Sequence, residues 1–225
     1  MLGFIVFFLL MMLIPGWAQL KVRGAYKKYM KISNSTGLRG AEVARRILDD
    51  NGLFNVPVQE VGGQLSDHYD PRSKVVNLSS DIYHGTSIAG TAVAAHEVGH
   101  AIQDSKNYIP LRFRSSLVPV ANLGSNLAFP MILIGALFSF TGLALLGLIF
   151  FAAAVLFQIV TLPVEFNASS RAMKQVVALG IVHGDERKGA RKMLSAAAMT
   201  YVAATLVAVL QLLWFALSFI GLNED

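Results

Sequence analysis

The chain has 225 residues, of which 54% are hydrophobic and only 15% are charged. Because a soluble domain usually carries about 25% charged residues, this composition argues against a soluble protein and favours a membrane protein. The chain contains no cysteine, which excludes disulfides, thiolate metal sites and a cysteine nucleophile.

The chain begins with an apolar run, residues 2–14, that ends at Pro15 and Gly16. The run is short for a hydrocarbon core of about 30 Å, but Trp17 extends it towards the interface. A cleaved signal peptide is the alternative interpretation, and it would carry a basic segment before the apolar run. No Lys or Arg precedes the run, so we predict an uncleaved transmembrane anchor at residues 1–18.

The most water-compatible part of the chain follows, and we expect it to form a small α+β portion. Its predicted elements are a helix within residues 35–53, short strands at 56–61 and 74–79, and an alanine-rich helix at 86–103. Ser35 or Thr36 is the expected N-cap of the first helix. Gly62-Gly63 and Asp70-Pro71 are typical of turns, and they separate the two strands.

The second half of the chain is dominated by long apolar segments. Residues 117–162 carry no charged side chain and are too long for one span, and Thr141-Gly142 near the middle predicts a tight helical hairpin. We therefore predict a mainly α membrane protein with four transmembrane helices, at about residues 2–17, 117–139, 143–162 and 196–218. The predicted domains are the anchor (1–18), a water-compatible α+β portion that contains the helix at 86–103 (19–115), a transmembrane hairpin (116–162), a glutamate-bearing helix and polar loop (163–195), and a last transmembrane helix with its tail (196–225).

The basic residues test this topology. Every Lys and Arg falls within residues 21–74, 106–114 or 171–192, which four spans place on one side of the membrane. The positive-inside rule puts that side in the cytoplasm of the cell membrane. Topology therefore accounts for the net charge of +5, and we expect no nucleic-acid partner.

The motif with the clearest chemistry is His96-Glu97-Val98-Gly99-His100, which lies within the predicted helix at 86–103. Residues i and i+4 share one face of a helix, so two imidazoles can bind one ion. The carboxylate of Glu97 lies beside them and can take a proton from the attacking water. This is the H-E-x-x-H arrangement of zinc metalloproteases.

Catalytic zinc generally needs a third protein ligand, which in a chain without cysteine must be His, Glu or Asp. Glu165 is the outstanding candidate, because it lies beside Pro163 where the third span ends. A carboxylate next to so much apolar sequence is functional by default. The alternative interpretation is an interfacial carboxylate that pairs with Arg171.

Three stretches of the chain, GQLSDHYDPRSKVVNLS, AAHEVGHAIQ and LPVEFNASSRA, resemble the YugP family of membrane zinc metallopeptidases. The chain is similar, more distantly, to the HtpX and Ste24 proteases. The resemblance implies one Zn²⁺ bound by His96, His100 and Glu165, with Glu97 as the general base. The wider HtpX-like pattern has an aspartate where this chain has Ser169, so Asn167, Ser169 or another group would have to do its work.

Other polar residues are candidates for supporting roles. Tyr83 or His84 could stabilise the oxyanion, and Arg171 could steady the transition state. The segment SDHYDP, residues 66–71, is either a plain Asp-Pro turn or part of a substrate or second metal site. The strand at 74–79 could be an exposed edge that aligns an extended peptide; its candidate residues are Val75, Val76 and Asn77.

These patterns predict a membrane-integral zinc endopeptidase that acts on protein or peptide substrates at the bilayer. A site-2-type intramembrane protease is a second hypothesis, but such enzymes close the metal site with an aspartate, and none occurs between Asp104 and Asp185. A metal-binding scaffold without turnover is a third. The presence of Glu97 argues against a scaffold, because zinc binding alone does not need it.

Overall fold

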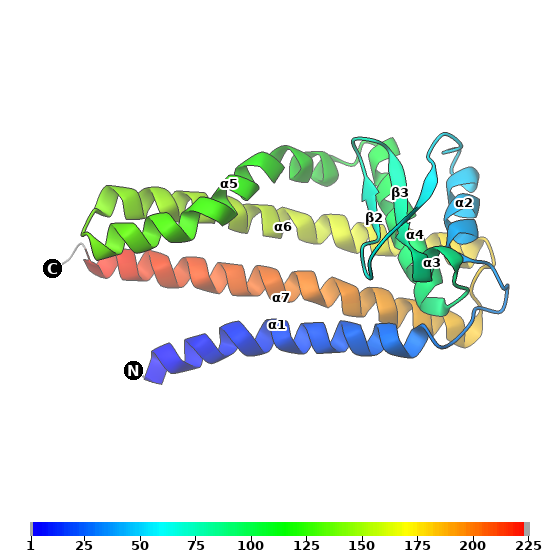
Figure 1. Cartoon of the computed structure of the whole chain (residues 1–225), viewed down its shortest axis with the longest axis horizontal. Helices are drawn as coiled ribbons and strands as arrows, with labels where there is room; N and C mark the ends of the chain where they lie inside the picture. The colour runs from blue at the N-terminus through cyan, green and yellow to red at the C-terminus, as the bar shows by residue number, and fades with distance from the viewer. Residues whose placement is uncertain (1, 223–225) are drawn as a thin grey trace. The chain divides into compact units, whose positions relative to one another are not determined.

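The computed structural model describes residues 2–222 and is mainly helical, with one small sheet (Figure 1). Four long apolar helices are each long enough to cross a membrane: α1 (Leu2–Tyr29), α5 (Ile109–Leu137), α6 (Thr141–Ala178) and α7 (Gly184–Leu222). The prediction of four spans and a mainly α fold is thereby confirmed. The chain turns between α5 and α6 at residues 138–140, where Ser139 has a φ of 53°.

The helices extend well beyond the apolar segments that the sequence defines. Helix α6 has 38 residues, so it is roughly 57 Å long at 1.5 Å per residue, against about 30 Å for a hydrocarbon core. Its last turns carry Glu165 and the residues that follow. The same backbone that provides a span therefore also provides a wall of the candidate site.

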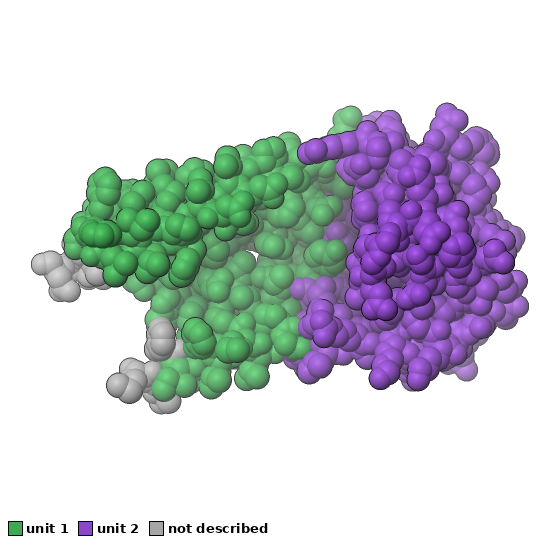
Figure 2. Space-filling model, in the orientation of Figure 1, with its two compact units in different colours: residues 1–16, 109–163, 201–225 green, residues 17–108, 164–200 purple. Residues whose placement is uncertain are grey.

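The chain forms two compact units (Figure 2). One consists of residues 1–16, 109–163 and 201–225, and it is helical wherever the structure describes it apart from the turn at residues 138–140. The other consists of residues 17–108 and 164–200 and contains the sheet and every predicted site residue. The predicted domains divide the chain elsewhere and stay a prediction.

The sheet has three strands in the order β1-β3-β2. Strand β1 (Val58–Val61) runs parallel to β3 (Val75–Ser79), and β2 (His68–Asp70) runs antiparallel to it. The segment SDHYDP, for which a plain Asp-Pro turn was one of two interpretations, thus includes a strand. The expectation that β3 is an exposed edge is wrong, because β3 is the central strand and pairs on both sides.

Helix α4 (Ile88–Ser105) is central to this unit, since fourteen of its eighteen residues are buried. Its alanines let α2 (Gly40–Asp50), the short α3 (Ser80–His84) and the sheet pack closely around it. The Ser87 hydroxyl caps α4 by accepting a hydrogen bond of 2.9 Å from the Gly90 N–H.

The start of α2 differs from the prediction. Neither Ser35 nor Thr36 caps it: the N-cap is Arg39, and the Glu42 carboxylate accepts a hydrogen bond of 2.7 Å from the Arg39 N–H. Thr36 donates to Asn34, and Ser35 donates to Glu186. The first residue of the helix is a glycine, and a side chain there would collide with the carbonyl of Ile82.

Candidate metal centre

Helix α4 presents His96 and His100 on one face, one turn apart. Their ring centroids are 4.8 Å apart and the rings are nearly perpendicular, with an angle of 86° between their planes. His100 is buried, and the neighbouring residues Ala95, Val98 and Ala101 of the same helix belong to the apolar core. The spacing of four residues between the histidines therefore places both imidazoles on the same face of the helix, as helix geometry predicts.

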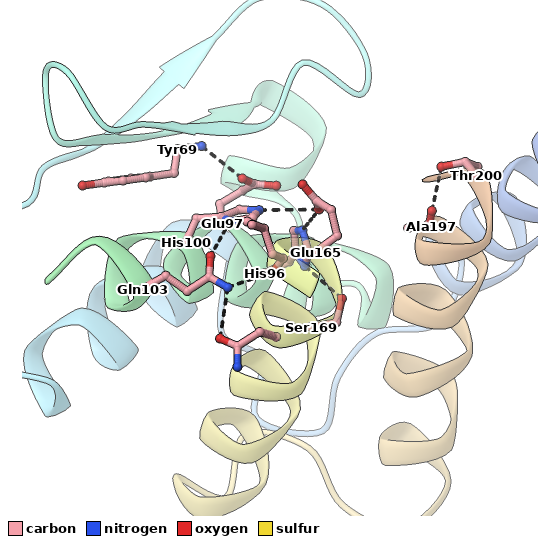
Figure 3. Close-up of polar contacts among 11 residues, drawn as sticks. Tyr69, His96, Glu97, His100, Gln103, Glu165, Ser169, Ala197 and Thr200 are labelled. Atoms are coloured by element: carbon pink, nitrogen blue, oxygen red, sulfur yellow. Dashed lines mark hydrogen bonds and ion pairs between the residues drawn. The ribbon is translucent and has the colours of Figure 1, made fainter. Parts of the chain in front are cut away.

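Glu165 of α6 lies against both imidazoles (Figure 3). Its Oε2 is 3.2 Å from His96 Nε2 and 3.6 Å from His100 Nε2, and the residue is only 3% exposed. The alternative pairing with Arg171 does not occur among the described residues, because the Arg171 Nε donates to Asn167 Oδ1 at 2.7 Å. Two segments that are 69 residues apart thus meet at one point.

A glycine allows this meeting. A Cβ added at Gly99 would lie 2.6 Å from the carbonyl oxygen of Ala168, closer than real Cβ atoms approach a backbone. Helices α4 and α6 therefore touch backbone to backbone one position before His100 and three positions after Glu165. This contact explains why a helix interior contains a residue that costs about 1 kcal/mol of helix propensity.

The donor set fits zinc. One ligand atom from each of His96, His100 and Glu165 lies within 4.8 Å of the others. A tetrahedral zinc ion, with ligands at about 2.0–2.1 Å, would hold its donors about 3.4 Å apart, close to the distances from Glu165 Oε2. Two imidazoles and one carboxylate are also the usual protein ligands of hydrolytic zinc.

The second nitrogen of each imidazole has its own partner. His100 Nδ1 donates to Gln103 Oε1 at 3.0 Å, and His96 Nδ1 lies 3.2 Å from Ser169 Oγ. A proton on Nδ1 leaves the lone pair on Nε2, the nitrogen that faces Glu165. The Gln103 oxygen, which only accepts, therefore favours the tautomer of His100 that a metal ion needs, and the Ser169 hydroxyl can accept from His96 in the same way.

Gln103 connects the two helices and is completely buried. Its Nε2 donates to the Val164 carbonyl at 2.8 Å and to Asn167 Oδ1 at 3.0 Å, while its Oε1 accepts from His100. The sequence analysis missed Gln103. Its spacing of three residues after His100, on the same helix face, was the signal that could have identified it.

The Glu97 carboxylate is buried and faces the sheet. Its Oε2 accepts a hydrogen bond of 3.0 Å from the backbone N–H of Tyr69, on the edge strand β2. The Tyr69 hydroxyl donates to Asp104, and burial together with this hydrogen bond raises the pKa of Tyr69. No sequence pattern signals a backbone N–H, so this contact could not be predicted.

Two carboxylates make the site electrostatically negative. Burial by itself lowers the pKa of His100, but the hydrogen bond with Glu165 and the charges of Glu97 and Glu165 outweigh it and raise the pKa. A potential that favours a protonated imidazole also favours a divalent cation at the same place.

The remaining candidates have their contacts elsewhere. His84 Nε2 pairs with Glu60 at 3.0 Å, and the Tyr83 ring lies edge-on to His84, so an oxyanion role for either stays a prediction. Asn77 lies 3.2 Å from His68 Nε2. Val75 and Val76 are buried in the central strand and offer no free edge.

A helical H-E-x-x-H pair closed by a distant glutamate is the site of one class of zinc metallopeptidases. The chain belongs to the family described as "Putative neutral zinc metallopeptidase", whose model matches residues 4–220. It is also 50% identical, over 209 residues and 93% of each chain, to a Bacillus subtilis (strain 168) protein named "Putative membrane protease YugP". No solved structure matches the chain significantly.

Proposed function

We propose that this protein is a membrane-integral zinc-dependent endopeptidase that binds one zinc ion per chain through His96, His100 and Glu165. The observation that carries the proposal is the approach of one Glu165 oxygen to both imidazoles, at 3.2 and 3.6 Å. Membership of a zinc metallopeptidase family supports it. Zinc bound there would supply an attacking water with a pKa of about 7 and would polarise the scissile carbonyl.

The chain's own residues then have distinct tasks. Glu97 accepts a proton from the attacking water and later gives it to the leaving amine. The Tyr69 N–H orients this carboxylate by holding its Oε2. Gln103 keeps the Nδ1 of His100 protonated, and Gln103 and Ser169 hold the two rings in place.

The edge strand β2 is the element best placed to align a substrate. It is an outer strand of the sheet, and the backbone of Tyr69 reaches Glu97. An extended peptide that paired with β2 would bring its backbone beside the metal centre with little dependence on side chains. Protein or peptide substrates of loose sequence preference are the expected consequence.

The active site is proposed to face the cytoplasm. The four candidate spans leave all basic stretches on one side, where the positive-inside rule expects them. Substrates would reach the site from water or as loops next to the bilayer. Among the described residues, the group that could hold a metal ion consists of His96, His100 and Glu165 and contains no aspartate. A site-2-type intramembrane protease would close its metal site with an aspartate, so this group favours the present proposal.

The test compares wild type with Glu97→Gln, purified with the full chain in detergent and loaded with zinc. We expect wild type to cleave casein, an unstructured protein, and Glu97→Gln to keep its zinc but lose at least about a hundredfold in rate, as general-base catalysis is worth 10²–10⁴-fold. Metal content is measured by mass spectrometry and cleavage by gel. If both proteins bind zinc and neither cuts casein or other unfolded substrates, the chain is a metal-binding scaffold instead.

A further inference from the structure

The unit that contains the metal centre also contains a groove of about 810 Å³. One wall is the end of α6, the other is the beginning of α7, and Lys21 of α1 completes it. Both walls combine basic, hydroxyl and apolar side chains.

The charged side chains of this groove are all cationic: Lys21, Lys174, Arg187 and Arg191. Within residues 2–222, the salt bridges found involve none of the four. Four cations without a carboxylate among them repel one another, so the groove is electrostatically complementary to an anion.

The two carboxylates that directly precede Arg187 in the sequence have other partners. Asp185 pairs with Lys188 at 2.8 Å, and Glu186 accepts hydrogen bonds from the backbone N–H groups of Ser35 and His183. Neither carboxylate lines the groove. The first turn of α7 therefore supplies no carboxylate that balances the positive charge of the groove.

The remaining lining is apolar with a few hydroxyls. Leu194 and Ala198 are buried in the floor, and Phe166, at 49% exposed, stands at the surface. The hydroxyls of Ser170 and Ser195 can donate to an anion. A ligand that fits this lining has an anionic, hydrogen-bond-accepting head and an apolar body.

The position of the groove residues along the candidate spans indicates which kind of anionic ligand the groove would bind. Its four cationic residues lie towards the end of the candidate spans in α1 and α6 and near the start of the one in α7. The cytoplasmic face of a bilayer is rich in acidic lipids, and basic pockets between membrane helices bind their headgroups. We propose that this groove binds an acidic phospholipid, with the phosphate among the cations and an acyl chain along the apolar residues.

The groove adjoins the metal centre. Ser169 lines it, and the Ser169 hydroxyl lies 3.2 Å from His96 Nδ1. A bound headgroup is thus one side chain away from a proposed zinc ligand. The lipid proposal concerns binding alone, so it stands or falls independently of peptidase activity.

The test measures lipid binding to the full-length protein by native mass spectrometry, with phosphatidylglycerol and phosphatidylcholine of identical acyl chains. We expect wild type to retain phosphatidylglycerol in preference. The double variant Arg187→Gln/Arg191→Gln should weaken phosphatidylglycerol binding roughly tenfold or more, because each Lys or Arg side chain near an acidic headgroup strengthens the binding of the lipid. The matched control is Lys188→Gln/Lys192→Gln, which removes the same charge from the same helix outside the groove and should change binding less than about twofold.

A second variant separates shape from charge. Ser170→Trp fills the groove without changing its charge, and it should also weaken phosphatidylglycerol binding. Equal binding of phosphatidylcholine, or equal loss in the two double variants, would overturn the proposal. Displacement of the lipid by inorganic phosphate at equal concentration would indicate a free-anion site, and displacement by an acidic peptide would indicate a protein-binding groove; either result also overturns it.

Discussion

Gly99 of α4 and Ala168 of α6 touch through their backbones, and this contact holds the histidine pair and Glu165 within reach of one ion. We expect Gly99→Ala to push the helices apart, because the new methyl would lie 2.6 Å from the Ala168 carbonyl oxygen. The cost is about 1–3 kcal/mol of unfolding free energy, as for other overpacked sites. Zinc content and thermal unfolding measure it.

The control for that variant is Gly62→Ala, since a Cβ at Gly62 meets nothing within 4 Å. The control should keep both its zinc and its stability. If Gly99→Ala behaves like Gly62→Ala, the close helix contact does not matter for the site.

Glu165→Gln tests the third ligand. A neutral amide is a far poorer zinc ligand than a carboxylate. We therefore expect zinc affinity to fall by more than the 10–100-fold that is typical when a residue that only hydrogen-bonds to a ligand is lost. Titration against a competing chelator measures the affinity. The exposed Glu60→Gln should leave it unchanged, and zinc retention in Glu165→Gln would show that another residue closes the site.

Gln103→Leu removes the acceptor for His100 Nδ1 and the side-chain donor to the Val164 carbonyl. We expect a loss of about 1–3 kcal/mol in stability, from buried groups left unsatisfied, and a 10–100-fold loss in zinc affinity. Gln103→Glu restores an acceptor and should recover part of the affinity. Zinc affinity is measured by chelator competition. Equal affinity in wild type, Gln103→Leu and Gln103→Glu would show that Gln103 does not support metal binding.

Ser169 occupies the position at which the HtpX-like pattern has an aspartate, and its hydroxyl contacts His96 Nδ1. A carboxylate accepts the imidazole proton more strongly than a hydroxyl does. We therefore expect Ser169→Asp to bind zinc as tightly as wild type or more tightly, and Ser169→Ala to bind it several-fold more weakly. The neighbouring Ser170→Ala is the control for zinc titration, and a loss of affinity there would mean that the effect is not specific to the His96 contact.

Much of the architecture could be predicted because it is local. Apolar length alone identifies four spans, and helix periodicity alone places His96 and His100 on one face. The predicted caps of α2 and the edge position of β3 were wrong for a common reason. Both depend on partners from other segments: β2 pairs with β3, and Ser35 hydrogen-bonds to Glu186 instead of capping α2.

The sequence by itself determined the membrane-embedded helical fold and the H-E-x-x-H chemistry, since composition and spacing within one helix decide both. Only the tertiary structure decided how Glu165, Gln103, Ser169 and the Tyr69 N–H surround the histidines. These contacts join segments from separate elements. Their geometry depends on the close packing of α4 against α6 and the sheet, which no local pattern encodes.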